Sequence, residues 1–315
     1  EMKLKKLIKF IGMPLMLFAF VFIIKKLIDM DIDISLFRSA SVTAALIIAA
    51  VGLTVVIITG TFPWTVFTQS LSQKKIPFAT AVPIYTQSNI LKYIPGNVFQ
   101  YVGRNKLAFD MNISHVDVAC ATILDIIFCL IWTGLISVAL LGGKIAEMLG
   151  KYGRNILIVG CIGVAAVIAV AVVIKLKFAD KVREYLSRYE KAFQKENRGK
   201  FMQGAFYYLF HNAFLAVMYF FCLKLIMGDT LPVSDIFALT GAYLFAWIIG
   251  FITPGAPGGI GIREGVMIFA CGDKYSDKVV LFVLVMRISS IIADITGFLI
   301  GKIWLAVQRA KAVSN

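Results

Sequence analysis

Three long runs of apolar residues, 10–24, 42–58 and 156–174, constrain this chain more than any other feature of its sequence. A helix needs about 20 mostly apolar residues to cross a bilayer, and the core of a soluble domain rarely hides several runs of this kind. Hydrophobic residues make up 59% of the 315 residues and charged residues only 16%, which excludes an ordinary soluble protein. The sequence therefore predicts an all-α polytopic protein of the cell membrane.

Seven segments are long and apolar enough to be membrane-spanning helices. They lie at 8–26, 41–65, 116–141, 155–175, 202–226, 233–253 and 279–305. We expect about seven to eight transmembrane helices in one integral membrane domain that covers residues 1–315. In this domain 1–154 is a first half, 155–200 is a connecting helix with a basic loop, and 201–315 is a second half.

An unusual pattern occurs once in each half. A Pro-Gly pair is followed after seven residues by an arginine, so that Pro95 leads to Arg104 and Pro254 leads to Arg263. Proline and glycine interrupt a helix, and an arginine at membrane depth is costly without an anionic partner. Broken segments at matching places in two halves indicate the binding site of a transporter.

The segments around these motifs, 76–112 and 254–272, are apolar but interrupted by further prolines and glycines. Broken backbone at membrane depth is tolerated where protein or a water-filled cavity surrounds it. We therefore expect two re-entrant segments. Their similar position in each half favours an internal repeat, whose sense, parallel or inverted, the pattern leaves open.

The basic segment 175–200 sets the expected orientation. It carries nine lysines and arginines against four acids, and loops rich in these cations stay on the cytoplasmic side. The lysines near the N-terminus then place that end in the cytoplasm as well. The cations near the C-terminus fit poorly, because they would lie outside if segment 254–272 returns to its own side. Either that segment crosses the membrane or one of the expected spans is wrong.

The same basic segment has apolar residues at steps of three and four, which predicts an amphipathic helix on anionic lipid headgroups. The alternative is a solvated loop that only sets the topology. Most of the net charge of +14 belongs to these flanks of the membrane segments, so we expect no nucleic-acid binding.

Several kinds of chemistry are excluded by what the sequence lacks. The five cysteines are scattered through apolar segments, which indicates reduced packing residues, with neither a disulfide framework nor a metal site. The glycines at 259, 261 and 265 miss the dinucleotide-binding spacing by one residue, and no phosphate-binding loop of an ATPase is present. We expect no cofactor.

Two signatures resemble those of the lysylphosphatidylglycerol synthase transmembrane-region family. The first is KYIPGN at 92–97 with YVGR at 101–104, and the second is PGGIGIREG at 257–265. Arg287 also resembles an arginine at the start of the family's last helix. The resemblance covers nearly the whole chain and implies the flippase-like region as a stand-alone member. No soluble aminoacyltransferase domain follows the membrane segments, so we expect no synthesis of lysyl-lipid.

The chemistry of the motifs fits a phosphate group independently of the resemblance. Glycines let backbone N–H groups face an anion, a helix that begins near Ile262 adds its positive end, and an arginine can hold two phosphate oxygens. The expected substrate-binding residues are Lys92, Asn97, Gln100, Arg104, Gly258, Gly259, Gly261, Arg263, Glu264 and Arg287. In the structural alternative the motifs only shape hairpins, and Arg263 pairs with Glu264 or Asp294.

Three further polar residues are candidates for coupling transport to protons: Asp125, His211 and Asp294. Asp125 shares a helical face with Asp117, and Asp294 shares one with Arg287, because residues seven or eight apart lie on one side of a helix. These residues either line a path for the headgroup or hold helices together by charge pairing. A single histidine is otherwise a packing residue.

We expect a lipid flippase that moves a phosphate-bearing lipid, either a polyprenyl-phosphate sugar or a phospholipid, across the cytoplasmic membrane. Its partners would be this anionic lipid, the surrounding membrane lipids and a separate synthase or glycosyltransferase. Without ATP, outward movement of one negative charge gains about 2.3 kcal/mol per 100 mV of membrane potential. The alternatives are a membrane-embedded enzyme that uses Glu264, His115 or His211 as acid or base, and a non-transporting scaffold.

Overall fold

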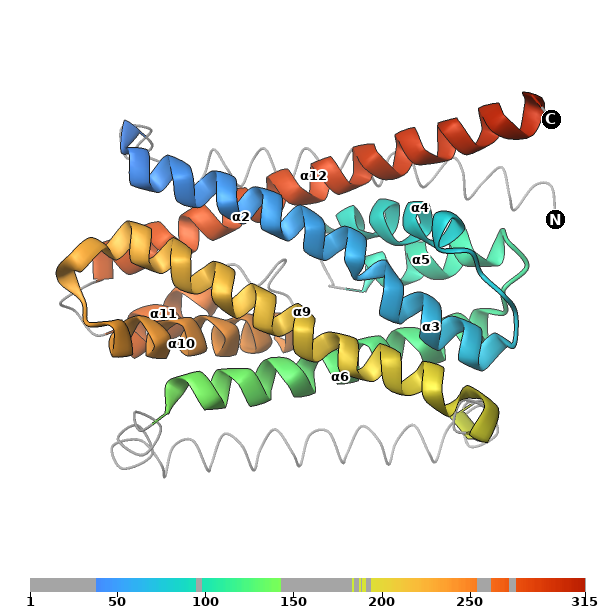
Figure 1. Cartoon of the computed structure of the whole chain (residues 1–315), viewed down its shortest axis with the longest axis horizontal. Coiled ribbons are helices and arrows are strands. Elements are labelled where there is room, and N and C mark those ends of the chain that lie inside the picture. Colours follow the sequence, from blue (N-terminus) through green and yellow to red (C-terminus); the bar gives the residue numbers. More distant parts are fainter. Residues whose placement is uncertain are drawn as a thin grey trace.

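The computed structural model describes residues 38–94, 98–142, 194–253, 262–271 and 276–314, together with the single positions 183, 187, 189 and 190. These residues are mostly helical and contain no strand (Figure 1), which confirms the all-α polytopic class. Five helical stretches are long and apolar enough to cross a membrane: Ala40–Ser72, His115–Leu141, Lys195–Thr230, Val233–Ile252 and Asp277–Ala310. The expected spans 8–26 and 155–175 lie outside the described residues, so the total number of spans stays a prediction.

The first described rod consists of α2 (Ala40–Thr59) and α3 (Thr61–Ser72), which follow each other through Gly60. A side chain at Gly60 would come within 3.0 Å of the Val56 carbonyl and 3.3 Å of the Tyr85 hydroxyl, so the close approach requires glycine. The rod extends to Ser72, seven residues past the end expected from hydropathy. This extension belongs to α3, and it buries Phe67 and Leu71 in the protein.

The first broken segment forms a hairpin of α4 (Phe78–Asn89), a short 3-10 turn η2 (Ile90–Tyr93) and α5 (Phe99–Phe109). Pro83 lies inside α4 and lacks the N–H that would bond to the carbonyl of Ala79. The Gln308 side chain of the last helix donates to this carbonyl at 2.8 Å. A proline that costs a backbone bond is therefore tolerated because a neighbouring helix satisfies the freed acceptor.

After this hairpin, α6 (His115–Leu141) returns through the protein and packs against α3, α5, α9 and α10. The second described half begins with α9 (Lys195–Met227), which ends at Gly228 with a positive φ of 62° and continues into the short turn η3 (Gly228–Thr230). Pro232 then caps α10 (Val233–Ile252). The positive φ at Gly228 is a conformation that glycine adopts without steric cost.

The second hairpin consists of α10 and α11 (Ile262–Cys271), which pack against each other, and α12 (Ser276–Ser314) follows. Figure 1 shows this hairpin at the left end of the molecule, whereas α4 and α5 lie at the right end. The two hairpins therefore enter from opposite ends. We expected 233–253 to cross the membrane completely. Its described helix, Val233–Ile252, is long and apolar enough to do so, and it also packs against α11 as one arm of this hairpin.

The flanking helices are also reversed between the halves. In Figure 1 the chain runs from left to right along α2 and α3 and returns along α6, whereas it runs from right to left along α9 and returns along α12. The described helices of the two halves thus run in opposite directions. The end of α12 consequently lies at the same end of the molecule as the start of α9, which removes the conflict over the C-terminal cations.

Packing separates an interior from a surface of large apolar side chains. The largest buried cluster joins α2, α9, α10 and α12 around residues such as Leu223, Phe282 and Met286. Large apolar side chains such as Val51, Leu135 and Phe210 face outward instead. Exposed apolar surface along every long helix is what contact with lipid requires.

Candidate functional site

A cavity of about 270 Å³ lies where the two hairpins meet. Tyr93 and Gln100 reach it from the turn of the first hairpin, and Gly250, Phe251 and Arg263 reach it from the second. Every described α-helix except α3 contributes to its wall. The inverted arrangement of the hairpins therefore brings residues far apart in sequence to one central space.

Most of the predicted site residues that the structure describes line this cavity. They are Lys92, Gln100, Arg104, Asp125, His211, Arg263, Arg287 and Asp294. Asn97, Gly258, Gly259 and Gly261 lie outside the described residues, as does the side chain of Glu264. The arginines of both motifs thus face the same space.

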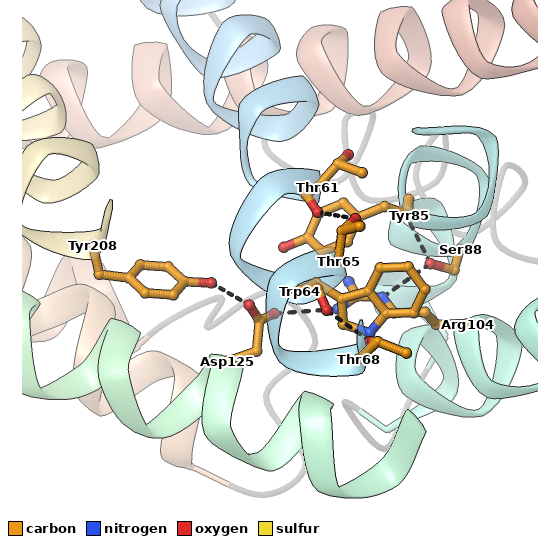
Figure 2. Close-up of polar contacts among 9 residues, drawn as sticks. All are labelled: Thr61, Trp64, Thr65, Thr68, Tyr85, Ser88, Arg104, Asp125 and Tyr208. Atoms are coloured by element: carbon orange, nitrogen blue, oxygen red, sulfur yellow. Dashed lines mark hydrogen bonds and ion pairs between the residues drawn. The ribbon is translucent and has the colours of Figure 1, made fainter. Parts of the chain in front are cut away.

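Arg104 on α5 is almost completely enclosed, with 2% of its surface exposed. Its guanidinium lies 3.7 Å from the centre of the Tyr85 ring, a cation–π contact that holds the side chain against α4. Its Nε donates to Ser88 Oγ at 3.4 Å, and its Nη1 donates to Asp125 Oδ2 at 3.3 Å. Figure 2 shows the arginine between the first hairpin and Asp125.

Asp125 is the anionic partner that a buried arginine needs. It projects from α6, is buried, and accepts a second, short hydrogen bond from the hydroxyl of Tyr208 on α9 (Figure 2). One carboxylate therefore connects α5, α6 and α9. Asp117, which shares its helical face, is also buried but does not reach the cavity.

Asp294 on α12 forms a second polar centre. Its oxygens accept bonds from Lys92 Nζ at 2.7 Å, Tyr93 Oη at 2.6 Å and Asn89 Nδ2 at 2.8 Å. All three donors belong to the first hairpin. Asp294 is thus surrounded by residues of that hairpin, and no bond from Arg263, the partner in the structural alternative, is found among the described contacts.

Arg263 lies in the first turn of α11 and enters the cavity from the second hairpin. Its Nε is buried and has no hydrogen-bond partner among the described residues. Buried polar groups are nearly always bonded, so an unsatisfied guanidinium nitrogen in a cavity wall indicates a missing acceptor. Arg287 on α12 faces the same space and is 7% exposed.

The described charges of the cavity do not balance. Four side chains are cationic, namely Lys92, Arg104, Arg263 and Arg287. Two described side chains are acidic, Asp125 and Asp294; the side chain of Glu264 lies outside the described residues, and Arg287 has a further interaction. A buried cation is costly in a low-dielectric interior unless an anion compensates it, and an anionic ligand would do so for Arg263, whose Nε has no partner among the described residues.

His211 on α9 also lines the cavity, packs against the rings of Tyr207 and Tyr208, and has an Nδ1 without a partner among the described residues. Sequence reasoning missed the aromatic part of the wall. It consists of Tyr85, Tyr93, Tyr101, Tyr208, Tyr219, Tyr243, Trp247 and Phe251. Single tyrosines in apolar helices could have signalled it, because a buried hydroxyl needs a polar neighbour.

The described residues contain no cluster of histidine, cysteine and acidic side chains that could hold a metal ion. The chain matches no curated protein and no solved structure. One protein family does match, over residues 7–296, and it is described as the lysylphosphatidylglycerol synthase TM region. Since this match covers most of the chain and includes both Pro-Gly motifs, the protein belongs to the lysylphosphatidylglycerol synthase transmembrane-region family.

Proposed function

We propose that this membrane protein, whose family has a lipid-related function, is a translocase that moves a phosphate-bearing lipid across the cytoplasmic membrane. The observation that carries the proposal is the buried Nε of Arg263, which has no hydrogen-bond partner among the described residues and lines a cavity shared by both hairpins. Phosphate esters have the anionic oxygens that arginine binds through its two-pronged donor group. The proposal makes the protein a carrier and leaves covalent chemistry to a separate synthase or glycosyltransferase.

The composition of the cavity wall supports a lipid as the ligand. Beside the four cations, the wall contains aliphatic side chains from several helices, among them Leu53, Ile57 and Leu215. A ligand with a charged headgroup and an apolar chain matches both kinds of surface. Both a polyprenyl-phosphate sugar and a phospholipid have this form.

Lipid transfer in proteoliposomes tests the proposal, with Arg263→Gln as the variant. Arg263 is the better choice than Arg104, because its Nε has no partner within the described residues and its loss breaks no ion pair found there. Arg309→Gln, at the exposed end of α12, is the matched control for removal of one cation. We expect at least a tenfold loss of transfer for Arg263→Gln, little recovery in Arg263→Lys, and normal transfer by the control.

The same experiment separates a translocase from an enzyme. Labelled lipids recovered from the vesicles should differ in leaflet and not in covalent structure. A new lipid species in their mass spectrum, or full transfer by Arg263→Gln, would contradict the proposal. Absence of transfer by the wild type with every phosphate-bearing lipid tried would favour a scaffold.

A further inference from the structure

Asp125 is a buried acid that anion binding alone does not need. Within the described residues its carboxylate has two partners, the Arg104 guanidinium and the Tyr208 hydroxyl (Figure 2). It therefore depends on a single cation for charge compensation. Asp294 also has one cationic partner, Lys92, but it accepts from two neutral donors where Asp125 accepts from one.

We infer that Asp125 takes up a proton when an anionic headgroup binds at Arg104, so that lipid binding and proton binding are coupled. This inference rests on the proposed function, since it needs a phosphate group in the cavity. In this role Asp125 is protonated while lipid is bound and loses the proton when the lipid leaves.

The contacts of Arg104 allow a phosphate to replace Asp125 as its anionic partner. Its two polar contacts, 3.3 Å to Asp125 and 3.4 Å to Ser88, are longer than the 2.7–2.9 Å of strong charge-assisted bonds. The cation–π contact with Tyr85 keeps the guanidinium in the cavity wall. A guanidinium has five donor hydrogens, and the two observed contacts leave most of them for a ligand.

Once a phosphate occupies Arg104, a charged Asp125 becomes unfavourable. It would lie buried beside a second anion, and both conditions favour the protonated form of a carboxyl group. Its other titratable neighbours are neutral at neutral pH: Tyr85, Tyr101, Cys129, Tyr207 and Tyr208. Of the described residues on α3, Trp64 stacks on Arg104 and none carries a charge.

The coupling changes what drives transport. A phosphodiester headgroup has one negative charge, and one proton on Asp125 cancels it. Transfer of the lipid together with this proton would then move no net charge. It would be insensitive to the membrane potential and would follow the pH gradient. The alternative proton acceptor is His211, which lines the same cavity.

The test measures the affinity of purified protein in detergent for two phosphodiester lipids, farnesyl phosphoglucose and dihexanoyl phosphatidylglycerol. Diesters are used because a phosphate monoester itself titrates near pH 6. For the wild type we expect Kd to rise by up to about tenfold per pH unit between about pH 6 and pH 8, the slope of one linked proton. The lipid that shows this slope identifies the headgroup class.

Asp125→Asn should bind with a Kd that does not change with pH and is at least as tight as the wild type at the alkaline end. A purely structural role for Asp125 predicts the opposite, weaker binding at every pH. Asp294→Asn is the matched control and should keep the slope, whatever its affinity. The inference is overturned by a slope that persists in Asp125→Asn, by a slope lost in His211→Gln, or by wild-type binding without a slope. Failure of the wild type to bind either lipid would instead overturn the proposed function.

Discussion

At the scale of single residues, the ion pair of Arg104 and Asp125 combines stability with the proposed binding role. Both side chains are buried, and their contact joins the first hairpin to α6. Removing one partner of a buried pair leaves an uncompensated charge and costs about 3–5 kcal/mol, whereas removing both costs much less. Loss of transport in an Arg104 variant alone would therefore not separate folding from binding.

Arg104→Gln should lower the free energy of unfolding by about 3–5 kcal/mol, because it removes the cation that compensates the buried Asp125 carboxylate. The double variant Arg104→Gln/Asp125→Asn should recover most of this loss, since it replaces the ion pair with two neutral amides. Thermal unfolding of the detergent-purified variants measures both effects. A double variant as unstable as the single one would show that the pair contributes nothing beyond packing.

The sequence identified Arg104 and Asp125 as site residues but could not pair them. A pattern within one helix shows which residues share a face, as it did for Asp125 and Asp117, and says nothing about the helix that packs opposite. For Asp294, too, the sequence could not identify the partner on a neighbouring helix. We considered Arg263, whereas the observed donors come from α4 and η2.

At the scale of elements, α12 holds the first hairpin in place at three levels. Asp294 binds the turn of the hairpin, Gln308 satisfies the carbonyl freed by Pro83, and between them Gly301 lies against Thr86. A Cβ atom at Gly301 would overlap the Thr86 hydroxyl. The close approach of α12 to α4 therefore depends on this glycine.

Gly301→Ala should destabilise the protein by about 1–3 kcal/mol, because the added methyl group forces α12 away from α4. Hydrogen exchange should then increase in Phe78–Asn89 and not in Val233–Ile252. Gly265→Ala on α11 is the matched control, since a Cβ there meets no other atom within 4 Å. Equal effects of the two substitutions would contradict this role of Gly301.

Hydropathy located the described long helices well, because the bilayer imposes their length and apolar character. It was less informative for the hairpins. It does not distinguish a complete span from an arm of a hairpin, since either can be 20 apolar residues long, as Val233–Ile252 is. The prolines and glycines located the breaks, while the way each break is stabilised, as by Gln308, depends on contacts distant in sequence.

At the scale of the whole molecule, the sense of the repeat was the property that the sequence left open. Two motifs with identical spacing fit a parallel or an inverted arrangement equally well. The sense depends on how many times the chain crosses between the halves, and Figure 1 places the end of α6 and the start of α9 at opposite ends of the molecule. An inverted pair of hairpins can close one central site from two sides, as in transporters with this architecture.

The charged residues at the two ends of the molecule differ in the way that the positive-inside rule requires. The helix ends and connections on the right of Figure 1 carry Lys74, Lys75, Lys195, Arg198, Lys200 and Arg309 with the acids Asp110 and Glu196. Those on the left carry Arg38, Lys224 and Lys278 with the acids Asp229, Asp235 and Asp277. This distribution predicts a cytoplasmic location for the end with the six cations, which includes the end of α12.

Single cysteines in a background without the five native ones test this orientation together with the inverted arrangement. Lys74→Cys reports the connection before the first hairpin, and Asp229→Cys reports the connection before the second; both native side chains are exposed. A membrane-impermeant maleimide should label Asp229→Cys in intact cells, and Lys74→Cys only after permeabilisation, because the hairpins enter from opposite sides. Arg309→Cys should behave like Lys74→Cys, because α12 ends on the cytoplasmic side.

Labelling of Lys74→Cys and Asp229→Cys from the same side would mean that both hairpins enter from one surface. In that case Arg104 and Arg263 could not close one cavity from two sides, and the proposed carrier would lose its structural basis.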